Sequence, residues 1–259
     1  MQDNQSAATD LYTLDPLNRF TQRADDYVKY RPSYPPEAID IILQGLAPAS
    51  QILAADIGAG TGIASRLLAL RGVKVIAVEP NGAMREAAQT HPNVEYREGS
   101  AEATNLPDAS VDVVTAFQAF HWFDPEPALL EFRRILKPNG RLALVWNNRD
   151  QNDDFTGEYS SFIREVSNNH PCEGADTFEE TLRQTQYFAN YYQHECTIKY
   201  RQELDLDALI GRTQSISYLP CEGESYEYLV SGLQDLYHKF RSERGFVEMV
   251  YQTSIHILT

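Results

Sequence analysis

The stretch Asp56-Ile57-Gly58-Ala59-Gly60-Thr61-Gly62 decides the fold, because it joins a short apolar run to a helical pattern through three glycines. Residues 51–57 have the near-continuous apolar character of a buried parallel strand. Residues 63–70 repeat apolar side chains at helical spacing and end at Arg71-Gly72, a common stop signal. Glycine permits the tight or left-handed backbone that such a turn requires. The sequence therefore predicts a strand–turn–helix unit whose turn approaches a ligand closely.

Strand and helix patterns alternate on both sides of this unit, which is typical of a parallel sheet covered by helices. Further strands are expected at 74–78, 94–97, 111–116 and 141–146. Helices are expected at 36–46, 81–89 and 125–136, the last two with Asn81 and Asp124 as N-caps. Beyond residue 148 the pattern weakens. We expect partial helix over 149–190, and strands at 193–203 and 246–258 that form an antiparallel pair.

Size and composition indicate one globular α/β domain with appendages. The chain has 259 residues, of which 42% are hydrophobic and 23% charged, a balance that suits a folded core. Asp and Glu number 37 against 22 Lys and Arg, and the resulting net charge of −15 would repel a phosphate backbone. We therefore expect no nucleic-acid substrate.

The cysteines and the start of the chain favour a reducing compartment. The three cysteines, Cys172, Cys196 and Cys221, are widely spaced and lack any CxxC or Cys/His ligand pattern. We expect neither a disulfide framework nor a metal site from them. The polar residues 1–6 do not resemble a signal peptide, and no stretch is long and apolar enough to span a bilayer. The expectation is a cytoplasmic protein without a membrane partner.

Two acidic residues narrow the choice of ligand. The glycine spacing is GxGxG rather than the GxGxxG of dinucleotide enzymes, and Asp56 stands directly at the end of the strand. A carboxylate there opposes a pyrophosphate but suits a ligand with an ammonium group. Glu79 ends the next strand, where a carboxylate can accept hydrogen bonds from ribose hydroxyls. The pair indicates a nucleoside joined to an amino acid, and an NAD-type oxidoreductase is the alternative.

Four successive motifs resemble those of class I S-adenosylmethionine-dependent methyltransferases. In chain order they are residues 55–62, Ala77-Val78-Glu79-Pro80, Gly99-Ser100-Ala101-Glu102 and Val111-Asp112-Val113-Val114. The resemblance implies a Rossmann-like three-layer sandwich, with a seven-stranded, mostly parallel sheet whose last strand is antiparallel. It also implies S-adenosylmethionine as the cofactor, S-adenosylhomocysteine as its product, and no metal.

The same resemblance implies a set of cofactor-binding residues. The methionine end would meet Asp56 and the turn residues Gly58, Ala59, Gly60 and Gly62. The ribose would meet Glu79 and Pro80, and the adenine edge would meet Ser100, Ala101 and Glu102. Many relatives have Asp where this chain has Ser100, so the Ser100 hydroxyl or the Ala101 NH would take that role. For Glu102 the alternative is a solvated loop acid.

Two further segments are similar to the trans-aconitate methyltransferase-like branch, which methylates small molecules, some of them carboxylic acids. These segments are residues 27–35 and 118–124. The first would fold over the cofactor as a lid that includes the cofactor-binding residues Tyr30 and Arg31. The second would lie at the reaction centre, where Gln118 can hydrogen-bond the methionine end of the cofactor.

Three side chains are candidates for the chemistry itself. His121 is the choice for a base if the acceptor is a hydroxyl or an amine, because imidazole titrates near neutrality. Trp122, like Tyr30, can attract a sulfonium to its aromatic face. Arg149 follows the fifth strand, and its guanidinium, like that of Arg31, can hold an acceptor carboxylate at two points. The alternative for His121 and Trp122 is a packing role. Tyr30 and Arg31 can instead anchor the lid, and Arg31 and Arg149 can instead be solvated.

We therefore expect a single methyltransferase domain over residues 1–259. Its parts would be a lid (1–35), a cofactor-binding core (36–148), a helical insertion that caps the substrate (149–192), and strands and helices that complete the sheet (193–259). The expected activity is methyl transfer from S-adenosylmethionine to a small molecule, with a carboxylic acid as one candidate. The alternatives are an NAD-type oxidoreductase and an S-adenosylmethionine-binding protein without turnover. The motifs specify neither the acceptor nor the oligomeric state.

Overall fold

A computed structural model describes residues 28–171, 178–195 and 199–259. The expected lid is therefore described only from Val28 onward, and Cys172 and Cys196 lie outside the described residues. None of the described helices is long and apolar enough to cross a membrane.

The centre of the molecule is a sheet of eight strands in the order β3-β2-β1-β4-β5-β8-β6, with β7 also paired to β8. The strands are β1 (Leu53–Ile57), β2 (Lys74–Val78), β3 (Val94–Arg97), β4 (Val111–Phe117), β5 (Leu136–Arg149), β6 (Tyr191–Glu195), β7 (Tyr200–Leu204) and β8 (Val247–Leu258). Strands β1 to β5 pair in parallel, and β8 runs antiparallel to β5. The expected Rossmann-like α/β fold is confirmed. Because the parallel strands end at one edge, the residues that follow β1, β2 and β4 meet there.

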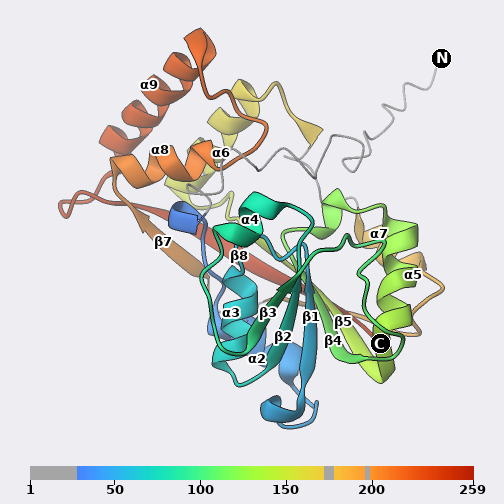
Figure 1. Cartoon of the computed structure of the whole chain (residues 1–259). Coiled ribbons are helices and arrows are strands. Elements are labelled where there is room, and N and C mark those ends of the chain that lie inside the picture. The colour runs from blue at the N-terminus through green and yellow to red at the C-terminus, as the bar shows by residue number, and fades with distance from the viewer. Residues whose placement is uncertain (1–27, 172–177, 196–198) are drawn as a thin grey trace, which may run out of the picture.

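Helices cover both faces of the parallel strands and give three layers (Figure 1). Helices α2 (Pro36–Leu43) and α3 (Ile63–Leu70) cover one face, where Ile39 and Leu68 belong to one buried cluster with Val145. Helices α5 (Pro125–Ile135) and α7 (Phe178–Gln184) cover the other face, with Phe132 and Leu182 in a second cluster. The short helix α4 (Gly82–Glu86) follows β2.

Local sequence signals explain where these helices begin. Helix α2 starts at Pro36, whose missing NH costs nothing in the first turn. Asn81 caps α4 as expected, since its Oδ1 accepts from the Met84 NH at 3.2 Å. Helix α5 begins at Pro125 as expected, but the Asp124 side chain makes no capping hydrogen bond, so that expectation was wrong.

At the C-terminal edge of the sheet, the expected strand segment 193–203 corresponds to β6 and β7. Strand β8 is twelve residues long. Its last residues pair with β6 and its first residues pair with β7, both antiparallel. The expected antiparallel pairing of this segment with the last strand is confirmed, and residues 196–198, between β6 and β7, lie outside the described residues. Strand β5 is longer than expected and includes the turn that was expected before residue 141. The pairing with β4 is irregular there, and Asn139 has a φ of 65°.

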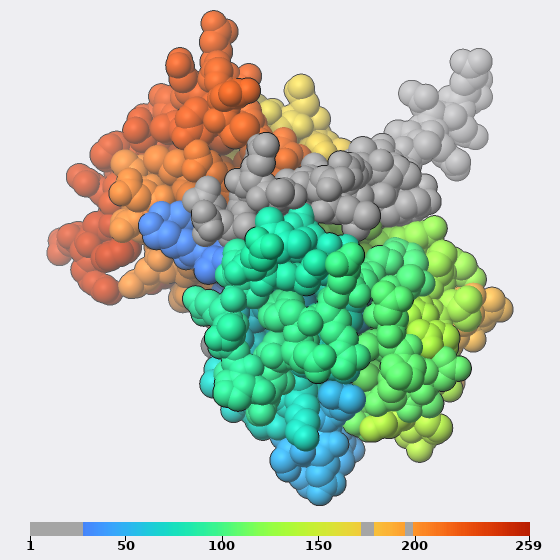
Figure 2. Space-filling model, in the orientation of Figure 1, coloured from blue at the N-terminus to red at the C-terminus, as the bar shows by residue number. Residues whose placement is uncertain are grey.

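Three helices form a lobe beyond the carboxyl edge of the parallel strands. They are α6 (Asp154–Val166), α8 (Leu206–Gln214) and α9 (Gly223–Phe240), and they share a third buried cluster with the first half of β8. Figures 1 and 2 show α8 and α9, in orange and red, standing off from the blue and green core. The lobe combines α6 from the expected insertion with two helices from the segment after residue 193. Strand β8 belongs to both the lobe and the core sheet.

Candidate active site

The glycine turn between β1 and α3 takes three left-handed backbone conformations. Gly58, Gly60 and Gly62 have φ angles of 65°, 56° and 76°, which L side chains rarely adopt. The Gly58 NH donates to the Val78 carbonyl oxygen at 2.9 Å, which ties the turn to the end of β2. A Cβ at Gly62 would stand 2.0 Å from the Tyr96 hydroxyl. The turn therefore needs glycine both for its backbone angles and for its close packing.

Asp56 is a buried acid at the end of β1. Its two carboxylate oxygens accept hydrogen bonds from Ser65 Oγ at 2.5 Å and from Thr115 Oγ1 at 2.9 Å. It is 1% exposed, and no described Lys, Arg or His forms an ion pair with it. Burial raises the pKa of Asp56 to about 6, and the two hydroxyl hydrogen bonds oppose that rise. A buried carboxylate in this setting suits the ammonium group of a ligand.

Glu79 directly follows β2 and holds the glycine turn through its carboxylate. Its Oε2 accepts from the Gly60 NH at 2.8 Å, and its Oε1 accepts from the Asn81 NH at 2.9 Å. Burial raises the pKa of Glu79, and the two NH groups act in the opposite direction. A carboxylate can accept about four hydrogen bonds, so Glu79 keeps capacity for ligand hydroxyls. Pro80, which follows it, is half-buried.

Residues 30–34 form a strap between the lobe and the sheet. On the lobe side, the Tyr30 carbonyl oxygen accepts from Gln202 Nε2 at 2.8 Å. Arg31 Nη2 donates to the Ser215 carbonyl oxygen, just after α8, at 2.7 Å. These contacts attach the described end of the expected lid to the lobe.

The sheet side of the strap is held by Asn147 of β5. Its Nδ2 donates to the Ser33 carbonyl oxygen at 2.9 Å, and its Oδ1 accepts from Thr253 Oγ1 at 2.6 Å. The next residue of the strap, Tyr34, packs edge-on against Phe117 with ring centroids 4.8 Å apart. The strap is therefore fixed to both halves of the molecule.

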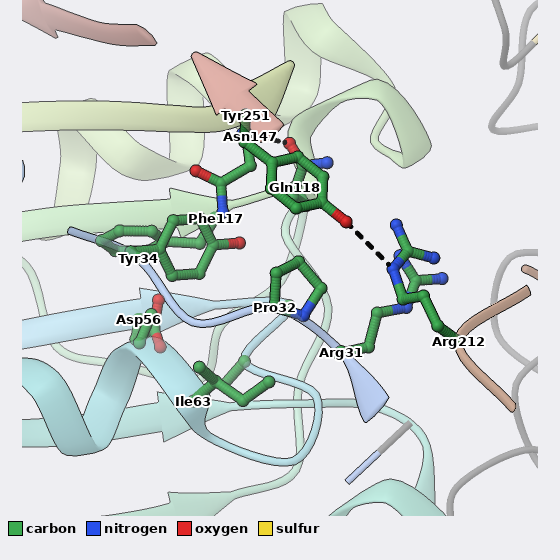
Figure 3. A pocket seen from close by; sticks show the side chains of 13 residues that line it. Arg31, Pro32, Tyr34, Asp56, Ile63, Phe117, Gln118, Asn147, Arg212 and Tyr251 are labelled. Carbon is green, nitrogen blue, oxygen red and sulfur yellow. Dashed lines mark hydrogen bonds between the residues drawn. The ribbon is translucent and has the colours of Figure 1, made fainter. Parts of the chain in front are cut away.

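The strap, the sheet edge and the lobe line a cleft that is partly open to solvent. Its lining comprises Arg31, Pro32, Tyr34, Asp56, Gly58, Ala59, Ile63, Ala64, Phe117, Gln118, Asn147, Arg212 and Tyr251. Five residues of the expected cofactor set are thus brought together. Figure 3 shows Asp56 and Arg212 on opposite sides, with Pro32 between them. No group of three or more His, Cys, Asp or Glu in the described part of the chain is placed to hold a metal ion.

Gln118 lies in the cleft lining with an unusual backbone. Its φ is 50°, in the left-handed region that only a few non-glycine residues adopt. The Gln118 NH donates to the Val145 carbonyl oxygen at 2.9 Å, and its Oε1 accepts from the Asn147 NH at 3.1 Å. Two hydrogen bonds to β5 therefore hold this conformation. Such strain is often found at binding sites.

The residues expected at the adenine edge lie outside the cleft lining and fix a loop. Ser100 Oγ accepts from the Ala103 NH at 3.2 Å. Ala101 is buried, and Glu102 Oε1 accepts from the Asp124 NH at 3.1 Å, at the start of α5. Contact between this loop and adenine stays a prediction.

The three expected catalytic side chains are not among the cleft-lining residues. His121 and Trp122 lie in the short 3-10 helix η4 (Phe120–Trp122). His121 Nδ1 accepts from Trp146 Nε1 at 3.3 Å, and Trp146 belongs to the buried cluster on the α5 side of the sheet. Arg149 lies over the ring of Tyr159, 5.5 Å from its centroid. The catalytic roles of His121, Trp122 and Arg149 stay predictions.

Five polar residues of the site were not anticipated from the sequence. Ser65 and Thr115 hold Asp56, and Asn147, Arg212 and Tyr251 line the cleft. For Ser65 and Thr115 a signal was available, since each is a small polar residue within an apolar helix or strand pattern. The other three carry no local signal, because their segments lack motifs.

Comparisons with known proteins identify relatives of this chain. The family model named "Methyltransferase domain" matches residues 55–144. An uncharacterized methyltransferase of Mycobacterium tuberculosis is 37% identical over 193 residues, which cover 74% of each chain. An uncharacterized methyltransferase of Schizosaccharomyces pombe is 35% identical over 208 residues, which cover 76% of this chain and 79% of the relative.

Solved structures of methyltransferases share the fold. A candidate type II methyltransferase from Anaeromyxobacter dehalogenans has a TM-score of 0.62 and 24% identity, covering 88% of this chain and 97% of that one. Phosphoethanolamine N-methyltransferase 2 of Haemonchus contortus, solved with phosphomonomethylethanolamine and S-adenosylhomocysteine, has a TM-score of 0.52 and 17% identity. That match covers 95% of this chain and 58% of the other. At these identities the likeness concerns the fold alone.

Proposed function

The chain belongs to the class I S-adenosylmethionine-dependent methyltransferases, and from this we propose that it methylates a small molecule bound in the cleft. The observation that carries the proposal is the pair of buried acids beside the glycine turn. Asp56 lines the cleft, and Glu79 clamps the turn from the end of β2. Their chemistry fits an amino-acid ammonium group and a ribose diol, which S-adenosylmethionine carries together.

We expect different residues around the cleft to bind different groups of the cofactor. Asp56 would accept hydrogen bonds from the ammonium group of the cofactor, Arg31 would donate to its carboxylate, and Glu79 would accept from its ribose hydroxyls. When bound, S-adenosylmethionine supplies a methyl group on a positively charged sulfur, which needs no further activation. The strap and the lobe would exclude water and hold the acceptor in line, which is the main catalytic requirement of such a transfer.

The cleft favours an acceptor that needs no general base. Its described lining holds no histidine or lysine, and its one acid is Asp56. A carboxylate acceptor is already ionised at neutral pH. A carboxylic acid is therefore our preferred acceptor class. For a hydroxyl or amine acceptor, His121 remains the candidate base, and the side chain would have to release the Trp146 indole NH.

Two alternatives make different predictions. An NAD-type oxidoreductase would place a pyrophosphate near the buried Asp56 carboxylate, which no described cation pairs with. A non-catalytic cofactor-binding protein would have the same acids at the turn but would transfer no methyl group.

Calorimetric titration with S-adenosylhomocysteine and with NAD, followed by a transfer assay, tests the proposed function. We expect S-adenosylhomocysteine to bind and NAD not to bind. With radiolabelled S-adenosylmethionine and fractionated small-molecule extracts, we expect label in at least one fraction, strongest among acidic compounds. Binding without transfer to any fraction would favour the non-catalytic alternative, and failure of S-adenosylhomocysteine to bind would overturn the proposal.

A further inference from the structure

Arg212 is a buried cation on the lobe side of the cleft. It is 6% exposed, and its Nη1 is buried and hydrogen-bonds no described group. Its Nε donates to the Tyr251 hydroxyl at 3.3 Å. No described Asp or Glu forms an ion pair with it, and its electrostatic neighbours include Tyr159 and Tyr218. Burying a guanidinium without an anion is costly, so stability alone does not account for this residue.

Arg212 gives the lobe side of the cleft a buried positive charge, opposite the buried acid Asp56. The described lining holds two cations, Arg31 and Arg212, and one acid, Asp56, in a chain whose net charge is −15. The amino-acid part of S-adenosylmethionine has one ammonium group and one carboxylate, which would use Asp56 and Arg31. Arg212 is then left for a second molecule.

The position of Arg212 agrees with an acceptor rather than a cofactor contact. Arg212 comes from α8 of the lobe, and Figure 3 shows it across the cleft from Asp56, with its guanidinium directed to the Tyr251 hydroxyl. That hydroxyl donates onward to Gln202 Oε1 at 3.3 Å, so its oxygen is turned to accept from Arg212. Gln202 also holds the strap through the Tyr30 carbonyl oxygen. The guanidinium is therefore oriented before any ligand arrives.

On the premise of the proposed function, we propose that Arg212 binds a carboxylate of the methyl acceptor and so selects small carboxylic acids as substrates. A guanidinium can donate two parallel hydrogen bonds to a carboxylate, which fixes both the position and the orientation of the acid. Tyr251 is a positioning residue for that guanidinium. The reacting atom of the acceptor would then lie between Arg212 and the Asp56 end of the cleft.

Titration of the full chain saturated with S-adenosylhomocysteine tests this assignment. The probes are acetate, succinate and tricarballylate, with succinamide as the neutral match for succinate. We expect at least one carboxylate to bind and succinamide not to bind. Arg212→Met should weaken that carboxylate by about 10- to 100-fold, and Arg212→Lys should give an intermediate loss because it keeps the charge without the planar fork. The matched control Arg201→Met removes an exposed guanidinium paired with Glu248 at 2.8 Å and should change nothing.

A second pair of probes tests whether Arg212 binds the carboxylate of the acceptor or that of the cofactor. S-Adenosylhomocysteine has the amino-acid carboxylate, and 5′-methylthioadenosine lacks it. We expect Arg212→Met to leave the affinity for both unchanged. Selective loss of S-adenosylhomocysteine affinity would place Arg212 on the cofactor and overturn the proposal. The proposal would also be overturned if wild type and variant bound every carboxylate equally, or if wild type saturated with S-adenosylhomocysteine bound no carboxylate.

Thermal unfolding of the ligand-free proteins tests a purely structural role for Arg212. Because its charge is uncompensated, we expect Arg212→Met to unfold at the same temperature as wild type or higher. A lower unfolding temperature together with unchanged carboxylate affinity would identify a structural arginine. If S-adenosylhomocysteine fails to bind the wild type at all, the proposed function itself fails, which is a distinguishable result.

Discussion

Burial of the Asp56 carboxylate costs stability in the ligand-free protein, and binding of a cationic ligand group would offset that cost. In the folded chain its pKa, about 6, lies above the usual 3.8 because burial disfavours the carboxylate. Between these two values the folded state therefore binds more protons than the unfolded state. The stability contributed by Asp56 is present at acid pH, falls as the pH rises from about 4 to about 6, and stays low above that. Binding of an ammonium group would offset this cost.

Replacement of Asp56 by Asn should therefore stabilise the ligand-free protein near pH 8, relative to wild type. The gain should shrink below pH 6, where Asp56 is protonated in the folded state. Affinity for S-adenosylhomocysteine should fall about 10- to 100-fold. Thermal unfolding across pH and calorimetry measure the two effects. Asp40→Asn, at an exposed ion pair with Arg71, is the matched control. A pH-independent loss of stability with normal affinity would contradict the expectation.

Gly62 tests whether the turn needs glycine for its backbone angle, for space, or for both. Gly62→Ala should cost about 2–4 kcal/mol in unfolding free energy, from the left-handed φ and from contact with the Tyr96 hydroxyl. In the Tyr96→Phe background the hydroxyl is gone, and the cost should drop to about 1–2 kcal/mol. Urea unfolding measures both. Gly223→Ala, at a φ of 75° with no atom within 4 Å of the new Cβ, should show the backbone cost alone. Equal costs in both Tyr96 backgrounds would exclude the steric part.

Among the elements, the strap depends on side chains from β5 and β7 and on a backbone carbonyl just after α8. Asn147→Ala should remove the hydrogen bond to the Ser33 carbonyl and leave the buried Thr253 hydroxyl without its acceptor. We expect a loss of about 1–3 kcal/mol in stability and faster amide exchange in the strap. We also expect a higher KM for S-adenosylmethionine, because the strap includes Arg31.

The neighbouring Asn148→Ala is the control for the strap. Its side chain is exposed and donates to Ser254 Oγ at 3.2 Å, so its effect should stay within about 0.5 kcal/mol. Hydrogen exchange followed by mass spectrometry measures both variants. Unchanged exchange over residues 30–34 in Asn147→Ala would show that the strap is held without Asn147.

At the scale of the whole molecule, separate buried clusters predict separate cooperative units. Leu233 is fully buried in the lobe cluster, and Leu142 is fully buried in a core cluster. Each Leu→Ala change should cost about 2–5 kcal/mol. Leu233→Ala should speed amide exchange in α6, α8, α9 and β7 more than in β1 to β4, whereas Leu142→Ala should speed exchange in β1 to β4 more than in the lobe. Uniform exchange in Leu233→Ala would mean that β8 couples the lobe and the core into one unit.

The elements that could be predicted are those whose signals are local. Helix α3 and strands β2 and β3 have the expected bounds, because each apolar pattern is interrupted by glycine, proline or a charged residue. The bounds of the edge strands β6 and β7 differ by one or two residues from the expected 193–203. Where β6 begins and β7 ends depends on how each pairs along β8, which lies more than forty residues away in the chain.

The same distinction between local and long-range signals holds for the residues of the candidate site. The sequence alone determined the glycine turn, Asp56 and Glu79, because strand order and glycine spacing act over a few residues and set the carboxyl edge of a parallel sheet. Only the tertiary structure decided the opposite wall of the cleft. Asn147, Arg212 and Tyr251 are scattered along the chain and meet through the packing of the lobe on β8. Their chemistry depends on burial and on partners that packing supplies, and no local pattern carries that information.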